Sequence, residues 1–548
     1  MFIFTRILHP AMLGLLFLSL GTSVQGDTDA DNRITTALQE QITVPDHAIL
    51  ALAHDWNRLQ HFYQARNLAP AWLENDEPGT AAIQLRQALH TADVEGLNPA
   101  DYHIYKLEQL WHNTSPNARA ILDILLTDAF FRYALHVRMG RLSPSEADPK
   151  WHLAAPETDL VRLLAEALAG PDFAKALADL PPPHSGYKRL RAALAHYRDI
   201  ARNNGWPELE PGPLLREGMQ HPQVRVLRQR LAADGTLRTE LVEDAERYDR
   251  FVKYAVEQFQ VRHGLKMDGV VGPDTRAALN VPVSQRITQL KLNMARWRWL
   301  PRSLGKRYII VNTAAFELSA YENDQTLLTM WVVIGKQQRQ TPVIGGSMHT
   351  VVFNPYWTVP LTLAIEDIIP AQLANPDYMQ KRGIRVLADL ANNIEVDPAT
   401  VNWRAYNRNN FPYVLRQDPG PANPLGRVKF LFANNFEIYL HDTPSRRLFQ
   451  HKQRTFSSGC IRVEDPLQLA IFLLGPHPDW DETRISEVMY SDETLEVGLS
   501  QRTPVYLLYL TSWVGQDGAV YFFQDIYARD TPLETCVSAS ADETQALP

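Results

Sequence analysis

The chain has 548 residues, which at roughly 100–200 residues per domain predicts three or four domains. Hydrophobic residues make up 45% and charged residues 21% of it, which excludes a disordered or collagen-like chain. With 54 basic and 62 acidic residues the net charge is −8, so no nucleic acid is expected as a partner. The two cysteines, Cys460 and Cys536, are too few for a disulfide scaffold or a cysteine-ligated zinc cluster.

Residues 1–26 have the pattern of a secretory signal peptide. Arg6 precedes the apolar run 11–20, and Val24 and Gly26 fit the cleavage positions. The run is about half of the ~20 residues that a membrane span needs. We therefore expect an exported, periplasmic protein, with cleavage and retention as an N-terminal anchor both open. Export would also permit a disulfide between the two cysteines.

Residues 45–217 predict a helical scaffold domain. Apolar side chains recur there at three- and four-residue spacing, as in 121–134 and 160–168. No reactive constellation stands out in this segment. Residues 218–281 predict a compact module of three short helices, the third of which begins at Pro273. Such a unit is too small for an enzyme but suits a binding module.

Residues 305–512 predict a mostly β domain. Strands are expected at 308–312, 327–334, 436–440 and 505–510, with a turn at Asn323 and Asp324. The stretch 358–421 is too long for a tight connection, so we expect an inserted lid or capping subdomain. Residues 513–548 predict a strand at 520–523 and then a polar tail. The expected fold class is therefore multidomain α+β.

One segment of the β domain predicts a cysteine nucleophile. His441 ends an alternating apolar run, and Cys460 follows 19 residues later. A thiol becomes a nucleophile when its pKa is lowered and a base can take its proton. Five basic residues and one acidic residue, Asp442, lie between 441 and 462. This excess of positive charge is expected to favour the thiolate and to attract substrates with carboxylates.

The turn Ser457-Ser458-Gly459 before the cysteine predicts an oxyanion site. Gly459 permits a tight turn, so its N–H and that of Cys460 can face a developing oxyanion. Asp465 and Pro466 predict the N-cap and first turn of a helix just after the thiol. A lone cysteine or histidine is more often structural, but the turn, the basic setting and the nearby imidazole together favour chemistry.

The order of the two residues argues against a papain-like protease, in which the cysteine precedes its histidine. The only histidine after Cys460 is His477, which is held between two prolines. A histidine followed by a cysteine is the order to explain.

His441, the Ser-Ser-Gly-Cys turn and Arg462 resemble the signature of the YkuD-type L,D-transpeptidases. Strings at 354–360, 419–421, 425–430 and 439–444 resemble the large periplasmic YcbB type, and 218–281 resembles the peptidoglycan-binding three-helix domain of cell-wall enzymes. The sequence has His-Asp where much of the wider family has His-Gly, and Ser-Ser where many members have Ser-His. The group that orients His441 is therefore open.

The resemblance implies acyl transfer on peptidoglycan stem peptides. Cys460 would attack the carbonyl of meso-diaminopimelate in a tetrapeptide donor and expel the terminal D-alanine, giving a 3→3 cross-link. His441 would act as general base and acid, with the backbone N–H groups of Ser458 and Gly459 as oxyanion hole and Tyr439 as a helper.

The resemblance also implies substrate contacts and partners. Arg462 would hold a substrate carboxylate or pair internally with Asp465 or Glu464, and Trp357 would line the pocket under the lid or belong to a core. No metal or organic cofactor is expected. Carbapenem β-lactams are expected as covalent inhibitors, and a cell-wall synthase as a partner.

Other readings stay open. Water as acceptor would give an L,D-carboxypeptidase, and a protein lysine would give protein attachment to the wall. A non-catalytic wall-binding scaffold, with Cys460 tied to Cys536, is the alternative of a different class.

Overall fold

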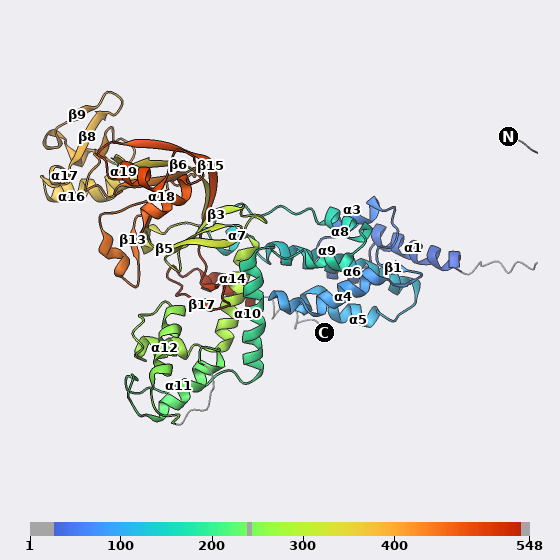
Figure 1. The fold of residues 1–548 in the computed structure, drawn as a ribbon. Helices are drawn as coiled ribbons and strands as arrows, with labels where there is room; N and C mark the ends of the chain where they lie inside the picture. Colours follow the sequence, from blue (N-terminus) through green and yellow to red (C-terminus); the bar gives the residue numbers. More distant parts are fainter. Residues whose placement is uncertain (1–26, 238–243, 539–548) are drawn as a thin grey trace, which may run out of the picture.

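The structure is a computed structural model that describes residues 27–237 and 244–538 (Figure 1). The predicted signal peptide lies outside these ranges. A helical part stands at one end and a β-rich part at the other, with a small helical module beside the latter. The long helices α10 (Ser185–Arg202) and α14 (Val283–Arg298) lie between them. The predicted multidomain α+β organisation is confirmed. No helix of the described residues has the length and apolar character of a membrane span.

The N-terminal part is built around one central helix, α6 (Pro116–Met139). The Ser115 side chain accepts the Ala118 N–H at its start, and Pro116 stands in the first turn, where its missing N–H costs nothing. The helix is buried on all sides, as expected at the centre of a bundle. Around it lie α1 (Asp27–Thr43), α2 (His47–Leu52), α3 (Trp56–Ala65), α4 (Thr80–His90), α5 (Ile104–Leu110), α8 (Leu160–Ala169) and α9 (Phe173–Ala178). The short helix α7 (Pro144–Ala147) belongs instead to the hydrophobic cluster of the β-rich part, through Ala147.

Helices α10 and α14 pack with the β-rich part. Tyr187 of α10 and Trp297 of α14 belong to the same hydrophobic cluster as the β-sheet, whereas the core of the scaffold runs from Leu38 to Leu180. The predicted scaffold segment 45–217 therefore crosses a packing boundary. Continuous helical periodicity does not mark this boundary, because it reports that a face is buried but not against what.

The three-helix module has its own hydrophobic core. Its helices are α11 (Pro222–Ala233), α12 (Arg250–Arg262) and α13 (Pro273–Leu279), so the predicted start at Pro273 is confirmed. The buried amide of Gln260 accepts the N–H groups of Asp268 and Gly269 and so fixes the loop between α12 and α13. Lys452 of the β-rich part lies 3.3 Å from the Asp274 carboxylate of the module.

The β-rich part is a closed barrel. Its strands follow the order β5, β14, β12, β11, β6, β15, β3, β4, and β4 pairs with β5 to close the ring, while β13 flanks β5. Interior side chains such as Val311, Leu318 and Val332 are fully buried, so alternate residues face outward. The strands are β3 (Arg307–Asn312), β4 (Glu317–Glu322), β5 (Gln325–Gly335), β6 (Ile344–Phe353), β11 (Val428–Phe432), β12 (Leu440–His441), β13 (Thr455–Ser457), β14 (Ile461–Val463) and β15 (Leu495–Leu508).

The insertion within the barrel folds as a subdomain with its own core, for which we keep the name lid. A four-stranded sheet in the order β7, β10, β8, β9 packs against short helices. These elements are β7 (Trp357–Thr358), α15 (Leu361–Leu363), α16 (Ile369–Ala374), α17 (Tyr378–Lys381), β8 (Ile384–Asp389), β9 (Ile394–Val396) and β10 (Val414–Gln417). In the barrel domain, α18 (Pro466–Leu474) and α19 (Glu482–Met489) follow β14. The hairpin of β16 (Ser512–Val514) and β17 (Val520–Phe522) follows β15.

Two sequence predictions need correction. The strand expected at 436–440 begins only at Leu440, because the Asn434 side chain accepts the N–H groups of Phe436 and Ile438 and Glu437 adopts a left-handed φ of 54°. The expected polar tail begins as a helix, α20 (Asp530–Ser538), whose Leu533 is buried.

Candidate active site

Strands β12 and β14 bring the predicted catalytic residues together. They pair in parallel, with Leu440 beside Ile461 and His441 beside Arg462. Leu440 and Ile461 are fully buried inside the barrel, so His441 and Arg462 face its outer side. Cys460 immediately precedes Ile461 and is half-buried. Residues far apart in the chain therefore lie on adjacent strands of one sheet.

Among the side chains that the structure describes, Cys460 is a free cysteine. Its Sγ lies 3.9 Å from the carbonyl oxygen of Glu437. Burial raises the pKa of the thiol to about 11, although the N–H of Tyr439 and the guanidinium of Arg462 act in the opposite direction. The resting cysteine is therefore a neutral thiol that donates to a carbonyl. The turn that contains Glu437 and Tyr439, which lies where the sequence predicts a strand at 436–440, supplies both backbone contacts.

The expected basic setting of the thiol is wrong in its extent. Arg446 binds the Asp442 carboxylate at 3.0 Å, Lys452 binds the module, and the buried Arg454 stacks on Trp331 with 4.3 Å to the ring centroid. Of the basic residues between 441 and 462, Arg462 is the one that acts on the pKa of the thiol. The other cations of this segment therefore interact with groups away from the thiol. Burial of the sulfur raises its pKa more than Arg462 lowers it.

His441 is a neutral imidazole with one basic nitrogen available. Burial, reinforced by the Arg462 guanidinium, lowers its pKa to about 3. Its Nδ1 lies 2.5 Å from the backbone carbonyl oxygen of Asp442. An acceptor at that position places the proton on Nδ1 and leaves Nε2 as the base. The orienting group that sequence left open is therefore a carbonyl of the next residue.

The Asp442 carboxylate anchors this carbonyl. It accepts the backbone N–H of Arg427 at 2.8 Å and a guanidinium N–H of Arg446 at 3.0 Å. A Cβ on Gly426, whose φ is 61°, would lie 2.3 Å from the carboxylate, so the close approach requires glycine. The His-Asp departure from the family pattern thus has a structural role, since a glycine at 442 could make none of these side-chain contacts.

The Ser-Ser-Gly turn is held by internal hydrogen bonds. The Ser457 hydroxyl donates to the Cys460 carbonyl at 2.6 Å and accepts the Gly459 N–H at 3.1 Å. Gly459 has a φ of 120°, which only glycine adopts readily. Its N–H is already bonded, which contradicts its predicted place in the oxyanion hole. Within the described ranges, the N–H groups of Ser458 and Cys460 have no acceptor, and these two remain to serve an oxyanion.

Ser458 connects the catalytic turn to the lid. Its hydroxyl lies 3.1 Å from Nη1 of Arg339, and the same guanidinium lies 2.6 Å from each of two lid carboxylates, Glu366 and Asp367. Many relatives of the signature carry a histidine at this position. Here the serine completes a contact that fastens the lid over the turn.

Arg462 and Tyr439 present polar groups beside the sulfur. Neither predicted partner binds Arg462, because Asp465 caps α18 and Glu464 accepts the N–H of Trp331. The Nε of Arg462 is buried without a hydrogen-bond partner, and among the described residues no carboxylate lies within 4.0 Å of its guanidinium. Burial, with Cys460 and Glu437 nearby, raises the pKa of Tyr439, so its hydroxyl keeps its proton and can donate.

Trp357 belongs to the lid. It lies in β7, where it pairs with Gln417 of β10, and its ring packs against the lid core. The structure gives it no contact with Cys460 or His441, and the core reading of this residue fits its position.

The described residues with donor atoms close enough to hold a metal are His54, His103 and Asp128 of the scaffold, within 4.8 Å of one another. Sequence analysis missed this cluster because its members come from three separate segments. Both imidazoles lie 2.7 Å from the Asp128 carboxylate, and Arg132 contacts the outer nitrogen of His54. The donors are thus already bonded to each other beside a fixed cation, which disfavours a metal ion.

Comparisons with known proteins match the scaffold, the three-helix module and the barrel domain separately. A scaffold domain matches residues 57–194, a "Putative peptidoglycan binding domain" matches 220–279, and the YkuD family of L,D-transpeptidase catalytic domains matches 306–506. A Haemophilus influenzae protein described as "Putative L,D-transpeptidase" is 38% identical over 256 residues, which are 46% of this chain and 51% of that protein. The chain thus spans about half the length of this relative.

Two solved structures are also similar. An L,D-transpeptidase from Xylanimonas cellulosilytica shares 18% identity, with 55% of this chain and all of that chain covered, at a TM-score of 0.19. One from Stackebrandtia nassauensis shares 12% identity, with 55% and 96% covered, at a TM-score of 0.21. TM-scores this low add no support beyond the family match. Residues 306–506, which carry the cysteine, the histidine and the lid, match the L,D-transpeptidase catalytic domain of the YkuD family, and residues 220–279 of the same chain match a "Putative peptidoglycan binding domain".

Proposed function

We propose that this chain is a cysteine acyltransferase of the large periplasmic YcbB type that forms 3→3 cross-links between peptidoglycan stem peptides. One observation carries the proposal: a free, half-buried thiol and an oriented neutral imidazole lie on adjacent strands of the barrel. The peptidoglycan-binding domain in the same chain supports peptidoglycan as the substrate.

In the first half-reaction, Cys460 forms a thioester with the donor peptide. The sulfur bonds to the carbonyl carbon of the meso-diaminopimelate residue while Nε2 of His441 takes the thiol proton. The N–H groups of Ser458 and Cys460 donate to the oxyanion, with the Tyr439 hydroxyl as a further donor. Collapse breaks the C–N bond to D-alanine, whose nitrogen takes the proton from His441 and leaves as the amine.

In the second half-reaction, the side-chain amine of an acceptor stem attacks the thioester. His441 takes the amine proton and returns it to the sulfur, so a new amide replaces the one that was broken. The free energy for the new amide comes from the amide that was broken, so the reaction needs neither a nucleotide nor a cofactor. Water as acceptor would give the carboxypeptidase outcome, and a protein lysine would give attachment to the wall.

Charge and location complete the proposal. The guanidinium of Arg462, for which the described residues offer no carboxylate, is suited to a substrate carboxylate, and it lies close enough to Cys460 to act on the pKa of the thiol. Residues 1–26 would direct the chain to the periplasm, where a cell-wall synthase would supply donor strands. Trp357, in the lid core, would act on substrate only through the lid.

Intact mass of the full chain after incubation with a carbapenem tests the nucleophile and its class together. We expect one covalent adduct, its absence from Cys460→Ala, and its persistence in the matched control Cys536→Ala. Dipeptide exchange on purified muropeptides should follow the same pattern. Exchange retained by Cys460→Ala would end the assignment, and release of only the shortened donor would select water as the acceptor.

A further inference from the structure

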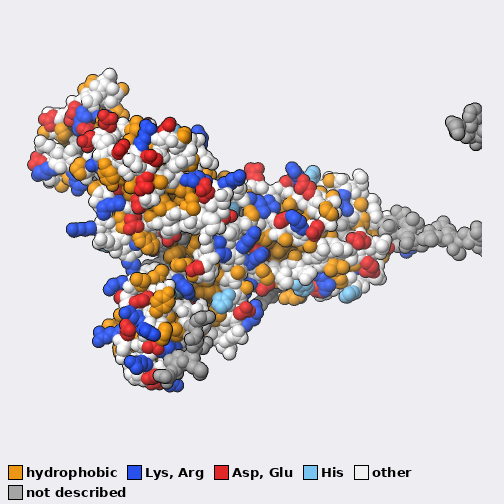
Figure 2. Space-filling view, viewed as in Figure 1, with side chains coloured by type: hydrophobic (Ala, Val, Ile, Leu, Met, Phe, Trp, Pro, Cys, Tyr) orange, Lys and Arg blue, Asp and Glu red, His pale blue; other side chains and the backbone are white. Residues whose placement is uncertain are grey.

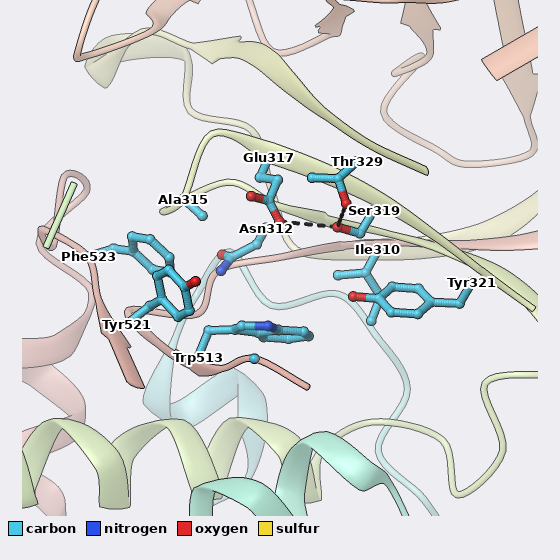
Figure 3. A pocket seen from close by; sticks show the side chains of 11 residues that line it. Ile310, Asn312, Ala315, Glu317, Ser319, Tyr321, Thr329, Trp513, Tyr521 and Phe523 are labelled. Atoms are coloured by element: carbon cyan, nitrogen blue, oxygen red, sulfur yellow. Dashed lines mark hydrogen bonds between the residues drawn. The ribbon is translucent and has the colours of Figure 1, made fainter. Parts of the chain in front are cut away.

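A cavity lies outside the proposed active site, on the outer face of the barrel. It has a volume of about 250 Å³ and lies between strands β3 to β5 and the β16–β17 hairpin (Figure 3). Trp513, Tyr521 and Phe523 of the hairpin form one wall, and the rings of the last two stack at 21°. Glu317, Ser319 and Thr329 of the barrel form the opposite wall. At a size below the ~300–1,000 Å³ of most ligand pockets, it suits one ring-sized group.

The polar wall offers donors and acceptors to such a group. The Ser319 hydroxyl donates to Glu317 at 3.1 Å and lies 3.2 Å from the Thr329 hydroxyl. Burial raises the pKa of Glu317, and within the described ranges no cation lies within salt-bridge distance of it. A desolvated carboxylate that accepts from one hydroxyl and has no ion pair keeps acceptor capacity for a ligand. A flat aromatic wall facing hydroxyl and carboxylate groups matches the two faces of a sugar ring.

The cavity also lies on the path of an extended substrate. Glu317 pairs with Trp331 of β5, and Val333, the next outward residue of β5, pairs with Arg462 of the active site. At about 4.8 Å per strand and 3.3 Å per residue, Cys460 is roughly 15 Å away on the same outer face. Figure 1 places β17 between the barrel and the three-helix module, and the ring centroid of Phe522 lies 5.8 Å from that of His263, which directly follows α12. In Figure 2 a hollow lies between the β-rich part and the three-helix module.

We propose that this cavity is a subsite for one N-acetylhexosamine ring of the glycan strand that carries the donor peptide. The inference rests on the proposed function. Three extended residues span about 10 Å, and the lactyl group that joins them to the sugar adds about 4 Å, so a stem peptide whose third carbonyl is at Cys460 can place its sugar near the cavity. The sugar would stack on Trp513 and present its hydroxyl and acetamido groups to Glu317 and Thr329. The module beside β17 would hold the same strand.

A cationic ligand fits less well, although aromatic rings with a carboxylate can also hold an ammonium. Three guanidinium groups beyond the lining act on side chains of the cavity, Arg454 on Glu317, Arg262 on Tyr521 and Arg189 on Tyr321, while the carboxylates that act there are Asp517 and Glu317 itself. Their summed charge opposes a cation but leaves a neutral sugar unaffected.

Binding of a peptide-free GlcNAc–MurNAc disaccharide to the full chain tests the proposal, with Cys460→Ala as background so that no turnover occurs. Calorimetry should give binding that Glu317→Gln weakens about tenfold, as expected for one or two lost contacts. Trp513→Ala should have a similar effect, and Glu317→Gln keeps the packing if the tryptophan variant loosens the hairpin. The matched control is Glu322→Gln, on the same strand but outside the cavity, where the carboxylate binds Arg307 at 3.1 Å.

A kinetic arm uses the catalytic cysteine. The ratio of kcat/KM for disaccharide-tetrapeptide over free tetrapeptide should fall about tenfold in Glu317→Gln and stay constant in Glu322→Gln. An unchanged ratio with unchanged disaccharide binding overturns the subsite. So does binding of n-butylammonium that depends on Glu317 while the disaccharide does not bind. Exchange retained by Cys460→Ala would instead refute the proposed function, so the two failures are distinguishable.

Discussion

Histidines occupy two contrasting environments in this chain. In the scaffold, His54 and His103 both bond to the buried carboxylate of Asp128 at 2.7 Å. In the catalytic domain, His441 bonds through Nδ1 to the carbonyl of Asp442 at 2.5 Å. Burial disfavours the charge of Asp128, but the hydrogen bonds from His103 and His54 outweigh it and hold the pKa of the carboxyl below its usual range.

The hydrogen-bond acceptor beside the imidazole differs between the scaffold cluster, where it is a carboxylate, and the proposed active site, where it is a backbone carbonyl. The Asp128 carboxylate accepts from two imidazoles at once and so joins separate segments of the scaffold. A carbonyl carries no net charge, and burial then keeps His441 neutral with Nε2 available as a base. Reactivity here comes from what the imidazole lacks, namely a carboxylate partner.

The largest effect is expected from His441→Gln. Glutamine keeps a polar side chain of similar reach but cannot take a proton at neutral pH, so dipeptide exchange should fall about 10³-fold, in the range of general acid–base catalysis. Steady-state assays on purified muropeptides measure this loss. His451→Gln is the control, since His451 is exposed in the same segment and should retain wild-type rates. Equal losses in both variants, with normal folding, would remove His441 from the proton transfers.

The pH dependence of the thiol tests whether the pair rests uncharged. With the pKa of Cys460 raised to about 11 by burial, the thiolate fraction rises about tenfold per pH unit from pH 7 to 10. Alkylation by iodoacetamide, measured in Cys536→Ala so that one thiol reacts, should follow that slope. Because His441 titrates at about 3, exchange activity should show no acidic limb near pH 6.5. Alkylation that levels off below pH 8 would indicate a thiolate–imidazolium pair instead.

A smaller loss of activity is expected from substitutions that keep the backbone carbonyl of residue 442 but remove the side chain that holds it in place. Asp442→Ala deletes the bonds to Arg427 and Arg446 and frees the peptide that orients His441, so kcat should fall about 10- to 100-fold with KM little changed. Asp442→Asn retains an acceptor for the Arg427 N–H and should recover part of the rate. A loss confined to KM, or no recovery with asparagine, would contradict a positioning role.

How far the sequence predicts the site follows from the range of each interaction. The order of histidine and cysteine, the helix start at Pro466 and the turn at Gly459 are local patterns, and the structure has the helix and the turn where they were expected. The charge around Cys460 was misjudged, because sequence proximity does not say which carboxylate or ring each arginine meets. The carbonyl on His441 and the Asp128 cluster depend on strand pairing and helix packing, which periodicity does not encode.

The smallest effect on activity is expected from Asp128→Asn, which removes charge from the structural cluster. An amide cannot accept from both imidazoles and the His54 N–H as a carboxylate does, so the scaffold should lose about 3 kcal/mol of stability. Since the carboxyl pKa is depressed, its contribution is present above about pH 4 and lost as the pH falls below that, and the variant should lack this acid dependence. Hydrogen exchange of α6 reports the loss, with the exposed Asp199→Asn as control. Exchange activity at a temperature where the variant is folded should match the wild type. A fall in kcat with α6 still protected would mean that the two histidine environments are coupled and that the carboxylate serves the reaction.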